Sequence, residues 1–242
     1  MQKDAMLALH DKVIELLTDE KRGKVLDAPA SEGVLAQRIQ KLGFEVWCSD
    51  IDPSRFKVTT LRCNYADLNQ KWPYEDGFFD IVICTEGIEH LENPWHVIRE
   101  INRVLKIEGA LFLSTPNVLS IKSRLSYLLY GYPNYFHYMI ETDPETGNEL
   151  PIDHINPIGF LELRHILCRS GFRIEFFETN HCQKHRSLLY KILKLVIATR
   201  GCSAGKEATK ADVRKTLLSD IVMFGENLIV KAKKVPDFVK DL

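Results

Sequence analysis

Long apolar runs are absent from this sequence. No stretch reaches the ~18 consecutive apolar residues of a membrane-spanning helix. The N-terminus also lacks the apolar core of a signal peptide, because charges at Lys3, Asp4, Asp11 and Lys12 interrupt it. There is no internal repeat and no low-complexity segment. These absences favour a cytoplasmic protein that touches the inner membrane surface at most peripherally.

Paired cysteines are absent as well. The six cysteines are scattered and none forms a C-x-x-C pair, which disfavours a redox motif. Cys48, Cys63 and Cys84 fall in or beside stretches expected to form buried strands. We interpret them as reduced core thiols of a cytosolic protein.

A general excess of positive charge is missing too, although the formal net charge of −1 conceals an asymmetry. Residues 1–180 carry 19 basic and 27 acidic side chains, whereas residues 181–242 carry 13 basic and 6 acidic ones. Nucleic-acid binding relies on a continuous positive surface, which the acidic body does not offer. We therefore expect no nucleic-acid partner.

What is present is the composition of one globular domain. The 242 residues are 45% hydrophobic and 27% charged, which suits a single α/β domain over 1–242 with a sizeable core. Apolar residues at helical spacing over 4–18 predict a leading helix. This helix is expected to pack on the sheet or to cover a ligand site.

Residues 24–50 predict a strand, a turn, a helix and a second strand. The first strand ends on Asp27, the turn contains Gly33, and the second strand ends on Asp50. This spacing suits two neighbouring parallel strands whose acids lie at their carboxyl ends. In open α/β sheets ligands bind at that edge, and an acid there typically accepts hydrogen bonds from ribose hydroxyls.

The rest of the chain continues the alternation of strands and helices. Asn93-Pro94 is expected to begin a helix that Gly109 closes. Two further helices are expected, at 119–130 and at 158–169. Further strands are expected at 61–63, 79–84, 110–114, 172–177 and 228–232.

Two stretches carry a family resemblance, KVLDAPASEG and FFDIVICTEGIEHLENP…REINRVLKIEGALFLSTPN. Together they resemble class I S-adenosylmethionine-dependent methyltransferases, in the type 11 and type 23 group that includes ubiquinone-biosynthesis O-methyltransferases. The resemblance covers residues 20–180. In the family's glycine-rich turn this chain has Pro29, Ser31 and Gly33, so two of the three glycines are missing. The turn suits the cofactor if Pro29 and Ser31 keep negative φ; the alternative is an ordinary strand-helix unit capped by Ser31.

The resemblance implies a Rossmann-like, doubly wound sheet of seven mostly parallel strands with an antiparallel seventh strand. In the family an acid placed like Asp67 accepts from the adenine amino group, and its neighbour Leu68 packs on the ring. The implied donor is S-adenosylmethionine, with these cofactor-binding residues: Asp27, Ala28, Pro29, Ala30, Gly33, Asp50, Ile51, Asp67, Leu68, Thr85 and Glu86.

A second constellation points to the methyl acceptor. An oxygen acceptor must lose its proton, and His90 and His154 are the candidate catalytic bases because imidazole titrates near neutral pH. Glu86-x-x-Glu89-His90 with His154 also resembles the E-x-x-E-H element of metal-binding O-methyltransferases. That predicts a divalent cation, Mg, Mn or Zn, which would lower the pKa of the acceptor hydroxyl. The alternative is that both histidines form hydrogen bonds that shape the pocket.

Residues 118–155 interrupt the pattern with an aromatic-rich insertion, where the resemblance places the acceptor pocket; a structural loop is the alternative. The D-x-P-A turn, T-P-N and H-I-N-P also look like methyltransferases of cell-surface glycan and lipid-linked sugar pathways. A sugar hydroxyl is therefore our first expected acceptor. A quinone precursor or small phenol is the second, and a non-catalytic binding module with this fold is the third reading.

The segment 184–215 lies between the expected sixth and seventh strands. Its part 184–200 holds five basic residues and no acid, interleaved with apolar ones. This pattern suits a helix at a membrane surface or in an oligomer interface such as a homodimer. The alternative is a helix packed on the domain with its lysines reaching to solvent.

Overall fold

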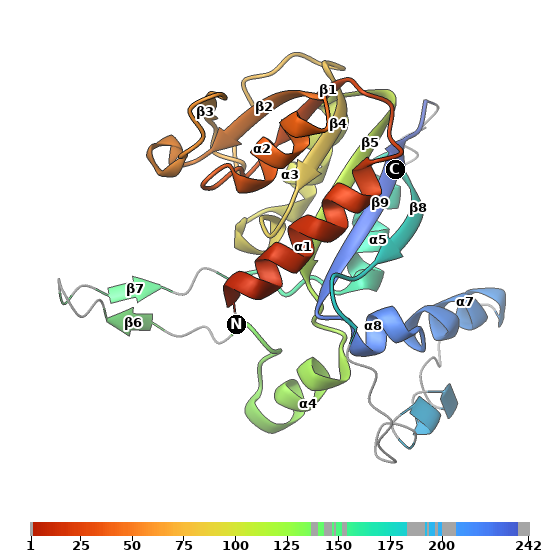
Figure 1. Cartoon of the computed structure of the whole chain (residues 1–242). Coiled ribbons are helices and arrows are strands. Elements are labelled where there is room, and N and C mark those ends of the chain that lie inside the picture. The colour runs from red at the N-terminus through yellow and green to blue at the C-terminus, as the bar shows by residue number, and fades with distance from the viewer. Residues whose placement is uncertain are drawn as a thin grey trace.

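The computed structural model describes residues 2–136, 140–142, 147, 149–151, 154–182, 192, 194–196, 198–199 and 207–236. Most of these residues form one α/β unit around a seven-stranded sheet (Figure 1). In spatial order its strands are β3 (Cys63–Tyr65), β2 (Glu45–Asp50), β1 (Lys24–Asp27), β4 (Phe79–Cys84), β5 (Leu105–Pro116), β9 (Asn227–Lys234) and β8 (Phe172–Glu178).

Strand β9 is antiparallel to both of its neighbours, whereas the other strand pairs of the sheet are parallel. This is the Rossmann-like sheet of seven strands that the resemblance implied. The strand order reverses direction between β1 and β4, so the loops that follow these two strands flank a crevice at the carboxyl edge.

Helices cover both faces of the sheet (Figure 1). Residues Val25, Ile81 and Ile83 pack against the layer of α1 and α2, whereas their chain neighbours Leu26 and Val82 pack on the opposite face. Each such side chain, once buried, stabilises the fold by roughly 1.5–3 kcal/mol. The covering helices are α1 (Gln2–Leu17), α2 (Val34–Lys41), α3 (Pro94–Val104) and α5 (Phe160–Arg169).

Most expected elements are present with shifted ends. Helix α3 begins as predicted, with Asn93 accepting a hydrogen bond from the His96 amide at 3.0 Å and Pro94 in the first turn. The prediction that Gly109 ends this helix is wrong, because the chain turns extended at Leu105 and enters β5 directly. Gly109 lies instead at an irregularity of β5, where a Cβ atom would come within 2.8 Å of a carbonyl oxygen.

The insertion after β5 contains α4 (Ile121–Tyr130) and a hairpin of β6 (Ile140–Thr142) and β7 (Glu149–Pro151). Figure 1 shows α4 beyond the carboxyl edge of the sheet and the hairpin projecting away from it. The sequence predicted the helix but not the hairpin, whose strands of three residues each are too short to show alternation.

The basic segment 184–200 lies largely outside the described residues; those described, 192, 194–196 and 198–199, are helical. Further along the chain come α7 (Glu207–Leu217) and α8 (Asp220–Phe224). Within the described parts of the chain, no helix is long and apolar enough to cross a membrane. Cys48 and Cys84 are buried free thiols and Cys63 is a partly buried one, in agreement with the prediction.

Candidate active site

The turn between β1 and α2 differs from the expectation in its backbone. Ser31 has a φ of +47°, so the negative φ that was the condition for the turn to suit the cofactor is not met at this residue. Its amide donates a hydrogen bond to Asp50 Oδ2 at 2.8 Å, which supports this uncommon conformation. The N-terminal cap of α2 is Gly33, with a φ of +83°, and not Ser31. A Cβ atom at Gly33 would lie 2.5 Å from the Phe56 ring, so both space and conformation require glycine.

A cavity of about 310 Å³ lies against this turn. Asp27 is 1% exposed, and neither of its carboxylate oxygens has a hydrogen-bond partner among the described residues. Burial, followed by the charge of Asp50, raises the pKa of Asp27 to about 8. The cavity is lined by Met6, Leu7, His10, Asp27, Pro29, Ala30, Ser31, Glu32, Val34, Leu35, Thr85 and Glu86.

Helix α1 closes one side of the cavity. Met6, Leu7 and His10 line it, while Leu9 and Val13 are buried against the sheet, so the helix both packs and covers. Burial and the charge of Arg38 lower the pKa of His10 to about 4, which leaves its imidazole neutral near pH 7. The sequence did not single out His10.

The three predicted donor-binding acids follow three neighbouring strands. Asp27 ends β1, Asp50 ends β2, and Asp67 lies two residues beyond β3. Asp50 accepts from the Ser31 and Asp52 amides, and Asp67 accepts from the Asn69 amide at 2.9 Å. Asp50 and Asp67 do not line this cavity, so the three acids share an edge of the sheet without lining one common cavity.

The residues beside these acids have opposite exposures. Ile51 is 61% exposed at the carboxyl edge of the sheet, whereas Leu68 is 5% exposed in the core. Ala28, the residue after β1, is fully buried and does not line the cavity. An exposed isoleucine beside a buried acid offers an apolar surface on which a flat ring can pack.

The turn after β4 forms the opposite wall. Thr85 and Glu86 line the cavity, and Glu86 has a φ of +47°. The Ser114 hydroxyl donates to Glu86 Oε1 at 3.0 Å. Gly87 packs on the turn after β1, since a Cβ atom there would lie 2.5 Å from Pro29 Cδ. The two turns therefore hold each other in place.

Beyond this wall the structure brings together three of the four predicted metal ligands. Candidate ligand atoms of Glu89, His90 and His154 all lie within 4.8 Å of one another, and the histidine rings are 4.7 Å apart. Glu86 is not part of this cluster. Glu89 is fully buried, and its carboxylate oxygens find no hydrogen-bond partner in the described structure. Burial, together with the charge of Glu86, raises the pKa of Glu89 well above its usual range.

Backbone contacts explain why residues so far apart in sequence meet here. The amides of Ile155 and Asn156 both donate to the Glu89 carbonyl oxygen at 2.9 Å. The side-chain amide of Asn156 donates to the Leu91 carbonyl oxygen. The H-I-N-P segment is thus attached to η2 (Ile88–His90), and this attachment places His154 beside His90.

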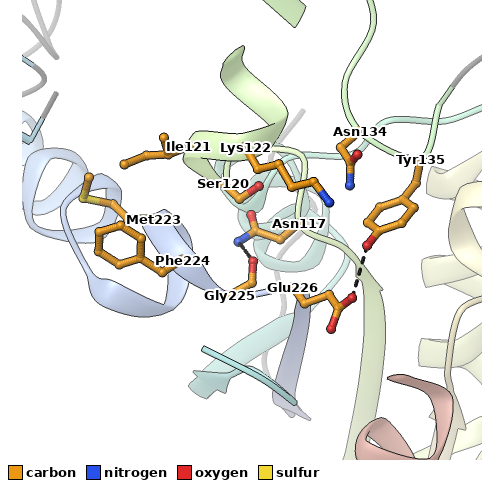
Figure 2. Close-up of a pocket in the computed structure, with 10 residues that line it drawn as sticks. All are labelled: Asn117, Ser120, Ile121, Lys122, Asn134, Tyr135, Met223, Phe224, Gly225 and Glu226. Carbon is orange, nitrogen blue, oxygen red and sulfur yellow. Dashed lines mark hydrogen bonds between the residues drawn. The ribbon is translucent and has the colours of Figure 1, made fainter. Parts of the chain in front are cut away.

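A smaller pocket of about 80 Å³ separates α4 from the turn between α8 and β9 (Figure 2). The Tyr135 hydroxyl donates to Glu226 Oε1 at 3.1 Å, and Lys122 points toward Tyr135. Burial and the nearby Glu226 raise the pKa of Tyr135. Burial, with a smaller contribution from the charge of Glu226, raises the pKa of Glu86.

The model of the methyltransferase domain family matches residues 1–175. The chain belongs to this methyltransferase family. Among curated proteins, the ubiquinone biosynthesis O-methyltransferase of Xanthomonas oryzae pv. oryzae is 33% identical over 103 residues, which is 39% of this chain. The match spans 43% of that relative's own length.

Solved structures show how widely this methyltransferase fold is shared. A SAM-dependent methyltransferase from Archaeoglobus fulgidus has a TM-score of 0.58 at 19% identity, covering 93% of this chain and 94% of its own. The cyclase SpnF has a TM-score of 0.56 at 17% identity, covering 95% of this chain and 81% of its own. Likeness at this level of identity shows the fold alone.

The predicted cofactor-binding residues include five of the twelve that line the larger cavity, namely Asp27, Pro29, Ala30, Thr85 and Glu86. His10 follows Met6 and Leu7 at helical spacing, which is the one signal that could have marked it. Glu226 directly precedes β9, and no local sequence pattern connects it with Tyr135.

Proposed function

We propose that this chain is an S-adenosylmethionine-dependent O-methyltransferase whose acceptor is a phenolic hydroxyl. The observation that carries the proposal is a cavity of about 310 Å³ with an unpaired buried carboxylate, separated by one turn from a Glu-His-His cluster. The name of the curated relatives supports an oxygen acceptor on a quinone precursor.

The donor would lie across the carboxyl edge of the sheet, and the residues there fit it. Asp27 offers an orphaned carboxylate to the ammonium of the methionine portion, beside the small Ala30. Asp50 would accept hydrogen bonds from the ribose hydroxyls, and Ile51 and Asp67 would contact the adenine. When bound, the donor supplies an electrophilic methyl group on a sulfonium leaving group. Ala28 and Leu68 support the site from the core rather than by contact.

The chain's own part in the reaction is to orient the acceptor, exclude water and receive its proton. His90 or His154 would take that proton as general base. The buried Glu89 beside them would stabilise the imidazolium that results. Tyr135 and Glu226 would border the acceptor, since they lie at the base of the insertion and are joined by a hydrogen bond.

We further propose that Glu89, His90 and His154 bind a divalent cation, with Glu86 nearby. The donor set suits Mg, Mn or Zn, and the unpaired buried carboxylate of Glu89 fits a cation. Such a cation would lower the pKa of the acceptor hydroxyl. If instead the histidines only form hydrogen bonds, they act as base and pocket wall.

The metal is tested by titrating the protein with MgCl2, MnCl2 and ZnCl2 in a calorimeter. Wild type should bind at least one of these ions, and His154→Ala and Glu89→Gln should weaken binding by tenfold or more, roughly, since each removes a ligand. His165→Ala is a matched control, because His165 packs on Trp95 away from the cluster. Unchanged metal-ion binding in both variants, or a rate of methyl transfer that a chelator does not change, would contradict the proposed cation site.

The donor is tested by calorimetry with S-adenosylhomocysteine. Binding supports the enzyme, whereas no binding at high micromolar ligand would favour the non-catalytic module. A screen of phenols against sugars then identifies the acceptor. The sugar hydroxyl stays a prediction, and two of its motifs now have structural explanations, since Asn117 of T-P-N and Asn156 of H-I-N-P hold the backbone.

A further inference from the structure

The end of helix α4 is apolar and exposed on every side. Tyr127, Leu128, Leu129 and Tyr130 are 62%, 77%, 67% and 67% exposed. Consecutive helical residues are about 100° apart, so four of them surround the helix axis. The helix stops immediately afterwards at Gly131, whose φ is +82°. This feature is a projecting tip and not one apolar face.

The other half of α4 is anchored to the domain, which gives the tip a fixed position. Ile121 and Ser123 are buried, and the Arg124 guanidinium donates to the Leu119 carbonyl oxygen at 2.7 Å. The Ser123 hydroxyl accepts a hydrogen bond from the Asn134 amide at 2.9 Å. The exposure of the tip is therefore not the fraying of a loosely attached helix.

A second exposed apolar group lies on the other side of α8. Ile192, Leu195 and Val196 are helical and 50%, 64% and 49% exposed. Lys194 in the same segment pairs with Asp220 at the start of α8 at 3.5 Å. Helix α4 meets the C-terminal end of α8 at the small pocket. Figure 1 shows both groups beyond the same edge of the sheet.

We propose that the α4 tip and residues 192–196 insert into the interfacial layer of an anionic membrane. A protein partner covers one side of a helix, whereas lipid surrounds a projecting tip on all sides. Tyrosines at both ends of a leucine pair suit the boundary between acyl chains and headgroups. The stretch 184–200 adds five basic residues and no acid, which complements anionic headgroups.

The proposal is tested by sedimentation with phosphatidylcholine vesicles, with and without phosphatidylglycerol. Wild type should sediment with the mixed vesicles, less so at high salt. The double variant Leu128→Ser/Leu129→Ser should have a vesicle partition coefficient at least roughly tenfold lower, because two apolar side chains no longer enter the lipid. Ile107→Ser is the matched control, since Ile107 is 54% exposed at the start of β5, at the opposite end of the sheet from α4.

The proposal would be overturned if the wild-type protein does not sediment with mixed vesicles, or if the double variant binds them as well as wild type does. A dimer in light scattering that the double variant dissociates, without vesicle binding, would assign the tip to a second copy instead. Calorimetry with S-adenosylhomocysteine should give the same affinity in all variants, which shows that they fold. The vesicle result does not depend on that ligand, so failure of the proposed function remains distinguishable.

Discussion

At the scale of single residues, the buried carboxyl of Asp27 makes the stability of the fold depend on pH. In the unfolded chain its carboxyl ionises near pH 4, whereas in the folded protein burial and Asp50 raise the pKa to about 8. Between these values the folded state holds a proton that the unfolded state has lost. The free energy of unfolding must therefore fall as the pH rises from about 4 to 8.

The substitution Asp27→Asn should stabilise the ligand-free protein at pH 8 by roughly 2 kcal/mol or more, because the amide carries no charge. The gain should shrink toward pH 4, where Asp27 is already neutral. The same variant should bind S-adenosylhomocysteine more weakly. Urea unfolding at pH 5 and pH 8, with calorimetry, measures both effects. The exposed Glu45→Gln is the control, and equal gains at both pH values would contradict the account.

Sequence patterns predicted the positions of such residues at strand ends, but they did not predict the backbone conformation or the hydrogen bonds around them. The acids at the strand ends follow from periodicity and spacing, as Asp27 and Asp50 show. The positive φ of Ser31 could not be predicted, because it depends on a hydrogen bond to a residue 19 positions away. The sequence also could not show that the buried Glu89 carboxylate lacks a hydrogen-bond partner in the described part of the chain, because this depends on segments that meet only in the folded protein.

At the scale of elements, Asn117 joins the end of β5 to the start of β9. Its side-chain amide lies within 2.9–3.2 Å of the carbonyl oxygens of Ile221, Val222 and Gly225. Its backbone amide donates to the Glu226 carbonyl oxygen at 2.9 Å. One residue thus fixes the base of the insertion to α8.

Replacing Asn117 by alanine should lower the free energy of unfolding by about 3 kcal/mol, since buried carbonyl groups lose their donor. Asn102→Ala removes one bond, to the Gly171 carbonyl oxygen at 3.3 Å, and should cost about 1 kcal/mol. Urea denaturation of both variants compares them. Equal losses would show that the contacts of Asn117 contribute little.

Element prediction succeeded where an element is long and its signals are local. The span of β4 was predicted to the residue, because five of its six residues are apolar and the run lies between turns. The start of β5 was not, because Leu105 continues the apolar face of α3 and also suits a strand. Packing between strands, which a single sequence does not record, decided that boundary.

At the scale of the whole molecule, the candidate acceptor side joins segments that are far apart in the chain. Residues 88–91 and 154–156 meet through backbone bonds, and 118–136 and 221–226 meet at the small pocket. The family resemblance made it possible to pair His90 with His154 before any coordinates. The backbone contacts that bring them together were not visible in the sequence.

Asn156→Ala should slow methyl transfer without weakening the binding of S-adenosylhomocysteine. The variant loses the side-chain hydrogen bond to the Leu91 carbonyl oxygen, so His154 is held less firmly. The larger cavity should be unaffected, because none of its described lining residues comes after Glu86 in the sequence. Turnover of the acceptor found in the screen, together with calorimetry, separates the two effects. Asn102→Ala again serves as control, and a parallel loss of ligand affinity would point to general unfolding.

The larger cavity is lined between Met6 and Glu86, whereas the cluster beside it is complete only with His154. On the ribosome, every residue that lines this cavity is therefore polymerised at least 68 residues (154 − 86) before the last residue of that cluster. In the nascent chain the proposed donor site is therefore synthesised in full before the proposed acceptor site.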